Sequence, residues 1–301
     1  MSDIPIIDAH QHFWDLERNH LPWLQDDPSI SFRYGDYSAI RRTYMPADYR
    51  RDAGRHRVVK SVFVETEWDP ADPAGEVRWV EEVAREHGLP NAVVAQAWLH
   101  RADVAEVLAG HAASPLVRGV RHKPAAAPSP DSVIPGAPGS MGDPQWRKGY
   151  ALLATHGLSF DLQTPWWHLG EAAALARDFP GVPLILNHTG LPADRSGKGL
   201  GGWREALEEL AGLPNTAIKI SGLGVPGQAW SVESNRTIVL DAIAIFGAER
   251  AMFASNFPVD SLVATFDTLY GGFKAITGHL PRAERLRLFH DNALRWYRIE
   301  E

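Results

Sequence analysis

The chain has 301 residues, of which 45% are hydrophobic, and this is enough to bury one large core. Its 30 basic and 37 acidic residues give a formal net charge of -7 with no basic block, which argues against nucleic acid as a partner. The chain has no cysteine, so disulfides and thiolate chemistry are excluded, and a metal site would have to use His, Asp, Glu or Asn.

The N-terminus lacks the pattern of a signal peptide, because Asp3 and Asp8 interrupt its apolar start. No run approaches the ~20 consecutive apolar residues that a membrane span requires. These features predict a cytoplasmic protein with a small-molecule substrate and no membrane partner.

The first strand is predicted from the apolar residues Ile4, Ile6 and Ile7, and it leads into His10 and His12. Side chains alternate along a strand, so these two histidines share a face and can hold one metal ion or one substrate atom between them. The pair by itself also fits one surface histidine beside one packing histidine.

A regular alternation of strands and helices follows a long loop over 13–36, which has no clean period and which we interpret as a lid. A short helix begins at Met45. A second long loop, over 124–144, is expected to cover the same end of the fold, and 191–202 reads as a polar loop. The predicted later strands cover 58–64, 92–99, 116–120, 158–162, 182–186, 216–220 and 251–254, and the predicted helices cover 73–87, 102–111, 145–156, 168–179, 203–211, 232–246, 262–276 and 281–297.

Eight strands that alternate with helices predict a parallel sheet closed into a (β/α)8 TIM barrel, as a single domain over 1–301. The alternative is an open doubly wound sheet, which usually carries a Gly-x-Gly-x-x-Gly turn after its first strand. Here that turn reads His-Gln-His.

Polar residues stand where the apolar strands end, and the C-terminal ends of barrel strands converge on one site. Three imidazoles, of His10, His12 and His188, could hold zinc with one open position. Arg121 could orient a carboxylate or polarise a carbonyl, or form a salt bridge on the rim. The full set of strand-end residues is His10, His12, Glu65, His100, Arg121, His122, Gln163, His188, Ser221 and Asn256.

Four segments, 7–14, 118–122, 186–190 and 253–258, resemble the amidohydrolase superfamily in order and in strand position. More narrowly, they look like its lactonase branch, which includes L-fuconolactonases and 2-pyrone-4,6-dicarboxylate lactonases. The resemblance implies metal ligands at His10, His12 and His188. It also implies a homo-oligomer by analogy.

Asn256 departs from the family pattern, which has an aspartate there that binds metal and takes a proton from water. An asparagine is neutral and is no general base. The fifth strand ends at Gln163 in place of a histidine, so a binuclear centre is not expected. The resemblance therefore leaves two alternatives, one divalent zinc or manganese ion or a metal-free site. Asp260 is a reserve base or, in our preferred interpretation, a helix cap.

These observations predict a hydrolase that opens a lactone or similar activated ester by attack of water. The expected catalytic residues are His10, His12, His122, His188 and Asn256. The expected substrate-binding residues are Trp14, Glu65, Arg121, Gln163 and Trp166. Two alternatives remain: a metal-dependent non-oxidative decarboxylase of an aromatic or unsaturated acid, and a barrel that only binds a small ligand.

Overall fold

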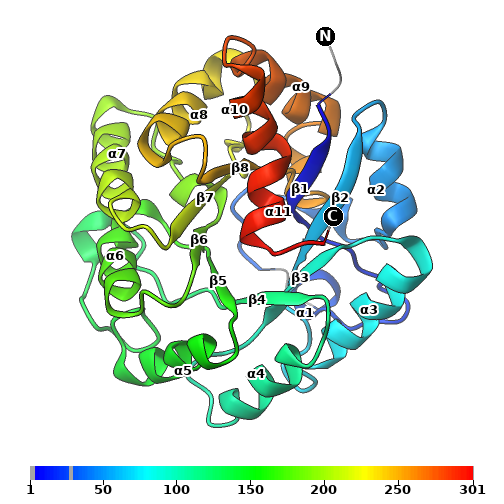
Figure 1. Cartoon of the computed structure of the whole chain (residues 1–301), viewed down its shortest axis with the longest axis vertical. Coiled ribbons are helices and arrows are strands. Elements are labelled where there is room, and N and C mark those ends of the chain that lie inside the picture. Colours follow the sequence, from blue (N-terminus) through cyan, green and yellow to red (C-terminus); the bar gives the residue numbers. More distant parts are fainter. Residues whose placement is uncertain (1–3, 27–29, 301) are drawn as a thin grey trace.

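The computed structural model describes residues 4–26 and 30–300, and these form a (β/α)8 barrel (Figure 1). Eight parallel strands follow one another around the sheet in chain order. A parallel bridge between Gln11 and Phe257 brings the end of the last strand back to the first. The strands are β1 (Ile6–Gln11), β2 (Val58–Val64), β3 (Ala92–Gln96), β4 (Val117–Arg121), β5 (Ser159–Leu162), β6 (Leu184–Leu186), β7 (Thr216–Ile220) and β8 (Ala251–Phe253).

Helices surround the sheet, as Figure 1 shows, and confirm the predicted fold class. Amphipathic patterns place their apolar faces on the strands, whose residues are therefore almost all buried. The α-helices are α1 (Pro22–Gln25), α2 (Pro46–Ala53), α3 (Gly75–His87), α4 (Val104–Ala112), α5 (Pro144–Thr155), α6 (Leu169–Asp178), α7 (Gly197–Ala211), α8 (Val232–Phe246), α9 (Phe266–Ile276), α10 (Arg282–Leu286) and α11 (Asn292–Trp296).

The α11 helix lies across one opening of the barrel, in red at the front of Figure 1. Tyr297, which follows it, packs with barrel residues such as Ile7 and Val94, and its hydroxyl donates to Asp161 over 2.9 Å. This end of the barrel is therefore filled. The carboxyl ends of the strands, where polar side chains were predicted to gather, form the opposite end.

The α7 helix begins at Gly197, inside the segment expected to be a polar loop. Ser196 caps it by accepting a hydrogen bond from Gly199 N–H over 3.0 Å. Among the glycines that obscure the helix in the sequence, Gly202 has a packing role, because a Cβ there would lie 2.6 Å from the ring of Trp166. The expectation of a loop over 197–202 is therefore wrong.

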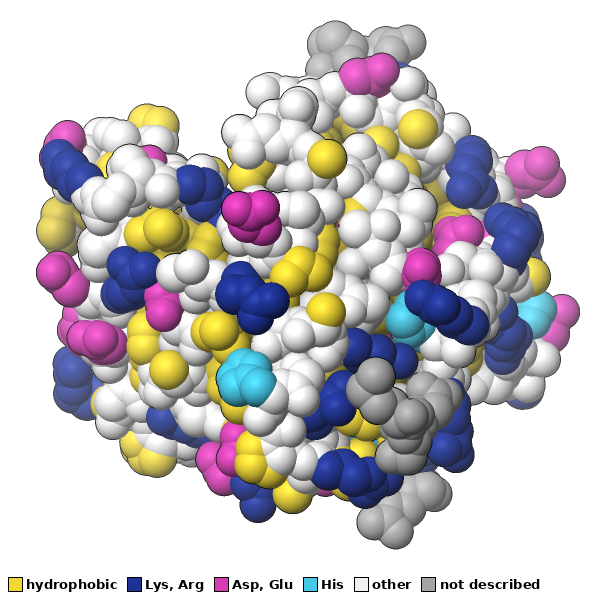
Figure 2. Space-filling model, turned by 90° about the horizontal axis from the view of Figure 1, so that it is seen from above, with side chains coloured by type: hydrophobic (Ala, Val, Ile, Leu, Met, Phe, Trp, Pro, Cys, Tyr) yellow, Lys and Arg dark blue, Asp and Glu magenta, His cyan; other side chains and the backbone are white. Residues whose placement is uncertain are grey.

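Basic and acidic side chains are interspersed on the face seen in Figure 2, with hydrophobic side chains in small separate groups. Across the described ranges, no helix is long and apolar enough to cross a membrane.

Candidate active site

A cavity of about 220 Å³ opens at the carboxyl ends of the strands. Strand-end residues form its floor, and residues from the 13–36 loop form part of its wall. Its lining includes His12, Trp14, Trp23, Phe32, Arg33, Glu65, Thr66, Glu67, Arg121, Lys123, Gln163, His188, Asn256 and Val259. The barrel thus brings together most of the residues that the strand-end pattern predicts.

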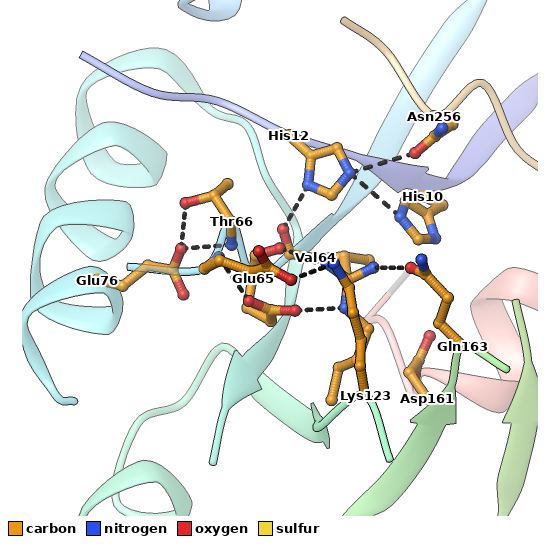
Figure 3. A network of polar contacts seen from close by, with 12 residues as sticks. His10, His12, Val64, Glu65, Thr66, Glu76, Lys123, Asp161, Gln163 and Asn256 are labelled. Atoms are coloured by element: carbon orange, nitrogen blue, oxygen red, sulfur yellow. Dashed lines mark hydrogen bonds and ion pairs between the residues drawn. The ribbon is translucent and has the colours of Figure 1, made fainter. Parts of the chain in front are cut away.

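His12 stands at the centre of the floor with a defined tautomer (Figure 3). Its Nδ1 lies 2.7 Å from the carbonyl oxygen of Val64, which can only accept, so Nδ1 carries the proton. Burial, followed by the charge of Arg121, lowers the pKa of His12 to about 3. The ring is therefore neutral, and its Nε2 offers a lone pair to the cavity.

Asn256 turns its carboxamide oxygen toward that lone pair. Its Nδ2 donates to Asp260 Oδ1 over 2.6 Å, and its Oδ1 consequently lies 3.3 Å from His12 Nε2. Two acceptors that face each other need a donor or a cation between them. This pair can therefore hold a water molecule by its hydrogens, or a metal ion.

Asp260 is the buried carboxylate that fixes this orientation. It accepts hydrogen bonds from Tyr34 Oη over 3.0 Å and from Gly222 N–H over 3.1 Å, and Arg33 lies 3.4 Å away. Burial raises the pKa of Asp260, and the nearby Arg33 opposes this shift. Asp260 caps no helix, because its oxygens are taken by these partners, so our preferred interpretation of it as a cap is wrong.

His10 and His188 lie beside His12. The ring centroids of His10 and His188 are 4.6 Å apart. His10 Nε2 lies 3.2 Å from His12 Nε2, and His188 Nδ1 lies 2.9 Å from Ser221 Oγ. Burial lowers the pKa of both rings well below the usual range, and positive charges such as Lys219 add to the effect at His10. All three imidazoles are therefore neutral, as metal binding or proton acceptance requires.

The backbone is strained where it presents two of these groups. His188 and Asn256 have φ angles of 53° and 56°, in the left-handed region that residues other than glycine rarely adopt. Gly222 makes room for His188, since a Cβ there would lie 2.8 Å from the imidazole. Glu67, another residue of the lining, has a φ of 57°, so left-handed backbone recurs at the cavity wall.

Arg121 is held rigidly at the edge of the cavity. Its Nε donates to Glu65 Oε1 over 2.5 Å, and its two terminal nitrogens donate to Glu65 O over 2.7 Å and Gln163 Oε1 over 3.2 Å. The other carboxylate oxygen of Glu65 accepts from Glu67 N–H over 2.6 Å. These bonds use three of the five N–H groups of the guanidinium. Within the described part of the chain, the other two N–H groups remain available to a ligand.

A buried ion pair, not foreseen from the sequence, lies inside the barrel. Lys219 Nζ is 2.5 Å from Asp161 Oδ1, and both side chains are fully buried. Burial lowers the pKa of Lys219 to about 8, while Asp161 opposes the shift. The available signal was a lysine within the apolar strand 216–220. Arg33 and Lys123 were also missed, because they come from segments with no regular period.

The structure does not bring His122 or Trp166 into the cavity, which corrects two predicted site residues. His122 Nδ1 accepts from Trp146 Nε1 over 2.9 Å and from Leu99 N–H over 3.2 Å, and burial lowers its pKa to about 4. Its ring lines a neighbouring cleft instead. Trp166 packs over Gly202 of α7, outside the cavity lining.

The spacing of the donor atoms fits one divalent ion. Ligands of a tetrahedral zinc ion, at about 2.0–2.1 Å from it, lie roughly 3.3 Å apart. The His10–His12 separation of 3.2 Å and the His12–Asn256 separation of 3.3 Å match this value. Within the described residues, no group of three or more His, Cys, Asp or Glu side chains could hold a metal. The imidazoles of His10, His12 and His188 therefore do not form the three-histidine ligand set that was expected. The third ligand would instead be the Asn256 carboxamide oxygen.

The sequence profile of the family described as Amidohydrolase matches residues 7–299. The uncharacterized protein y4mH of Sinorhizobium fredii is 45% identical over 99% of this chain and 100% of its own length. An L-fucono-1,5-lactonase of Burkholderia ambifaria is 29% identical over 98% of this chain and 96% of its own. A crystal structure of a Burkholderia multivorans amidohydrolase with bound zinc is 26% identical, with a TM-score of 0.78 over 98% of this chain and 99% of that chain. The resemblance inferred from the motifs is confirmed.

Proposed function

Because the chain belongs to the amidohydrolase family, we propose that its cavity hydrolyses a lactone or a similarly activated cyclic ester. A relative that matches nearly the whole chain is named a lactonase, and this supports the proposal. The observation that carries it is the pair of converging acceptors, His12 Nε2 and Asn256 Oδ1, in a cavity that Arg121 also lines.

The attacking water is held by both acceptors. One of its hydrogens points to His12 Nε2 and the other to Asn256 Oδ1, so an oxygen lone pair is free to attack the substrate carbonyl. Asp260 keeps the carboxamide of Asn256 in the required orientation, since the Nδ2 donor is engaged over 2.6 Å. This positioning lowers the entropic part of the barrier.

Arg121 stabilises the charge that develops on the carbonyl oxygen. Its guanidinium is almost fully buried and its remaining N–H groups need no reorganisation, because Glu65 and Gln163 fix it in place. In Figure 3, Glu65 lies below His12, and Gln163 lies just below His10.

His12 accepts the proton of the attacking water at Nε2 and returns it to the departing alkoxide. The pKa of about 3 makes the imidazolium a strong acid for the return of the proton and the neutral imidazole a weak base for its removal, so the stabilisation by Arg121 has to drive the attack. His10, His12 and Asn256 could instead hold a divalent zinc or manganese ion, which would take the place of the proton at His12 Nε2 and would supply Lewis-acid catalysis when bound. The products are then a hydroxy acid and a free enzyme with a neutral His12.

A panel of γ- and δ-lactones tests the proposal, with acid release followed by a pH indicator. We expect hydrolysis by the wild-type protein and by the exposed-surface control His279→Ala, and loss of at least about 100-fold in His12→Ala. Absence of hydrolysis across the panel would overturn the proposal. Carbon dioxide release from an unsaturated or aromatic acid would instead indicate a decarboxylase.

A further inference from the structure

A second hollow, the outer cleft, opens directly beside the catalytic cavity. It has a volume of about 500 Å³, and its wall includes Trp23, Trp68, Gln96, Trp98 and His122. The two hollows share six lining residues, namely Trp23, Ile30, Glu65, Glu67, Arg121 and Lys123. They are therefore two chambers of one binding site.

We propose that the outer cleft is a substrate subsite that receives an uncharged flat ring joined to the lactone. This inference rests on the proposed function, because it names the class of lactone that the site accepts. The inner cavity, of about 220 Å³, is smaller than the roughly 300–1,000 Å³ that encloses a drug-sized ligand. It holds one small ring, and a larger substrate has to extend into the cleft.

Three partly exposed indoles give the cleft its apolar character. Trp23 is fixed by its Nε1–H, which donates to Thr66 O over 2.7 Å. The guanidinium of Arg101 lies 5.3 Å from the ring centroid of Trp98, and Trp68 packs against Trp79 with a centroid distance of 6.2 Å. Indoles held in place at a cleft bind a flat ring at little entropic cost.

The charged side chains in the passage between the two chambers form ion pairs with one another, and this favours an uncharged ring. Arg121 pairs with Glu65, and Lys123 pairs with Glu67. Glu67 adopts a left-handed φ of 57° while its N–H donates to Glu65, so the two pairs are built into one loop. The two N–H groups that Arg121 has left are taken by the carbonyl oxygen of the lactone, and the other charges of the passage are paired, which favours a neutral extension.

Gln96 provides an uncharged polar group in the wall of the cleft. Its side chain is 9% exposed, and within the described residues its Oε1 is buried without a hydrogen-bond partner. An unpaired buried acceptor costs free energy that a ligand donor recovers. The ring that fits best therefore carries a hydroxyl or another small donor.

Two matched pairs of compounds test the subsite. The first pair is a δ-valerolactone with and without a hydroxyphenyl group on the carbon next to the ring oxygen. The second pair consists of the corresponding lactams, which resist hydrolysis and report binding by calorimetry. We expect the ring to lower the KM of the lactone and the Kd of the lactam roughly tenfold in the wild-type protein.

Variants localise the effect. We expect Trp98→Ala to remove most of the tenfold preference for the ring-bearing compounds, and Trp98→Phe to retain most of it. Trp296→Ala, on α11 at the opposite end of the barrel, is the matched control and should keep the preference.

The outcomes for the subsite and for the reaction are separate. Hydrolysis of both lactones with no preference for the ring, or a preference that Trp98→Ala leaves intact, would overturn the subsite. Failure to hydrolyse these two lactones and every other lactone of the panel would overturn the proposed function, while the lactam dissociation constants would still decide whether the cleft binds a ring.

Discussion

Asn256 donates a hydrogen bond of 2.6 Å to Asp260, and this bond determines which end of the carboxamide faces His12. The aspartate that the family resemblance implies at position 256 is absent, and a buried carboxylate, that of Asp260, lies four residues along the chain. There it acts through Asn256, because its oxygens are occupied by Tyr34, Gly222 and Asn256.

Asn256→Asp should lower activity. The new carboxylate would lie close to Asp260, and two carboxylates at such a distance share one proton, so the group facing His12 would lose its fixed acceptor character. We expect kcat/KM for a hydrolysed lactone to fall about 10–100-fold. The double variant Asn256→Asp with Asp260→Asn restores a single carboxylate and should recover part of the loss. A gain of both metal and activity in the single variant would show instead that the chain had lost a catalytic aspartate.

Arg121→Lys should impair catalysis and stability together. Lysine cannot reproduce the three bonds to Glu65 and Gln163, so the donor is misplaced and Glu65 is left partly unpaired. We expect kcat/KM to fall about 100–1,000-fold and the free energy of unfolding to fall by about 3 kcal/mol. Arg118→Lys, on the same strand, is the control, because Arg118 contacts backbone oxygens outside the cavity. Equal effects of the two substitutions would contradict the role given to Arg121.

Stability should decline when the pH falls below about 6.5. His12 and His122 have pKa values of about 3 and about 4 in the fold, so the unfolded chain binds protons that the fold does not. Above pH 6.5, His12 and His122 are neutral in both the folded and the unfolded chain. Below it, the free energy of unfolding should fall by about 1.4 kcal/mol per pH unit for each histidine. Urea unfolding between pH 7 and 4 measures this slope. His122→Gln should make it shallower, whereas His279→Ala should leave it unchanged.

Glu76 should produce the opposite slope at higher pH. Burial, followed by the charge of Glu65, raises the pKa of Glu76 to about 8. The fold keeps this proton between about 4.5 and 8 while the unfolded chain releases it, so stability falls by about 1.4 kcal/mol per pH unit as the pH rises. Glu76→Gln should remove this contribution, and Glu86→Gln, on the exposed part of the same helix, should not. A pH dependence identical in both variants would contradict the raised pKa.

Zinc binding should depend on His10 and His12. We expect about one equivalent to bind to the wild-type protein and to raise its melting temperature, because the ligands are already neutral and about 3.3 Å apart. His12→Ala should abolish both effects, and His279→Ala should preserve them. Stoichiometric zinc in His12→Ala would show that the ion binds elsewhere. No zinc in the wild-type protein would leave catalysis to His12, Asn256 and Arg121.

The sequence by itself determined the barrel, because apolar runs that alternate with amphipathic helices have few other ways to bury their surfaces. It also placed His12, His188 and Asn256 at the cavity, with His10 buried beside His12, since strand alternation and the convergence of strand ends are local rules. Local rules do not say which way a strand-end residue turns. That is why His122, the neighbour of Arg121, was expected in the site and is found in the adjacent cleft.

Only the tertiary structure decided the contacts between distant segments. The bonds from Tyr34 and Gly222 to Asp260, the pairing of Lys219 with Asp161, and the junction of the two chambers at Glu67 and Lys123 each join different elements. Their side chains are brought together by the closure of the barrel, and the low dielectric there sets their pKa values. The sequence defines the participants near each strand end, and the closed barrel defines their partners.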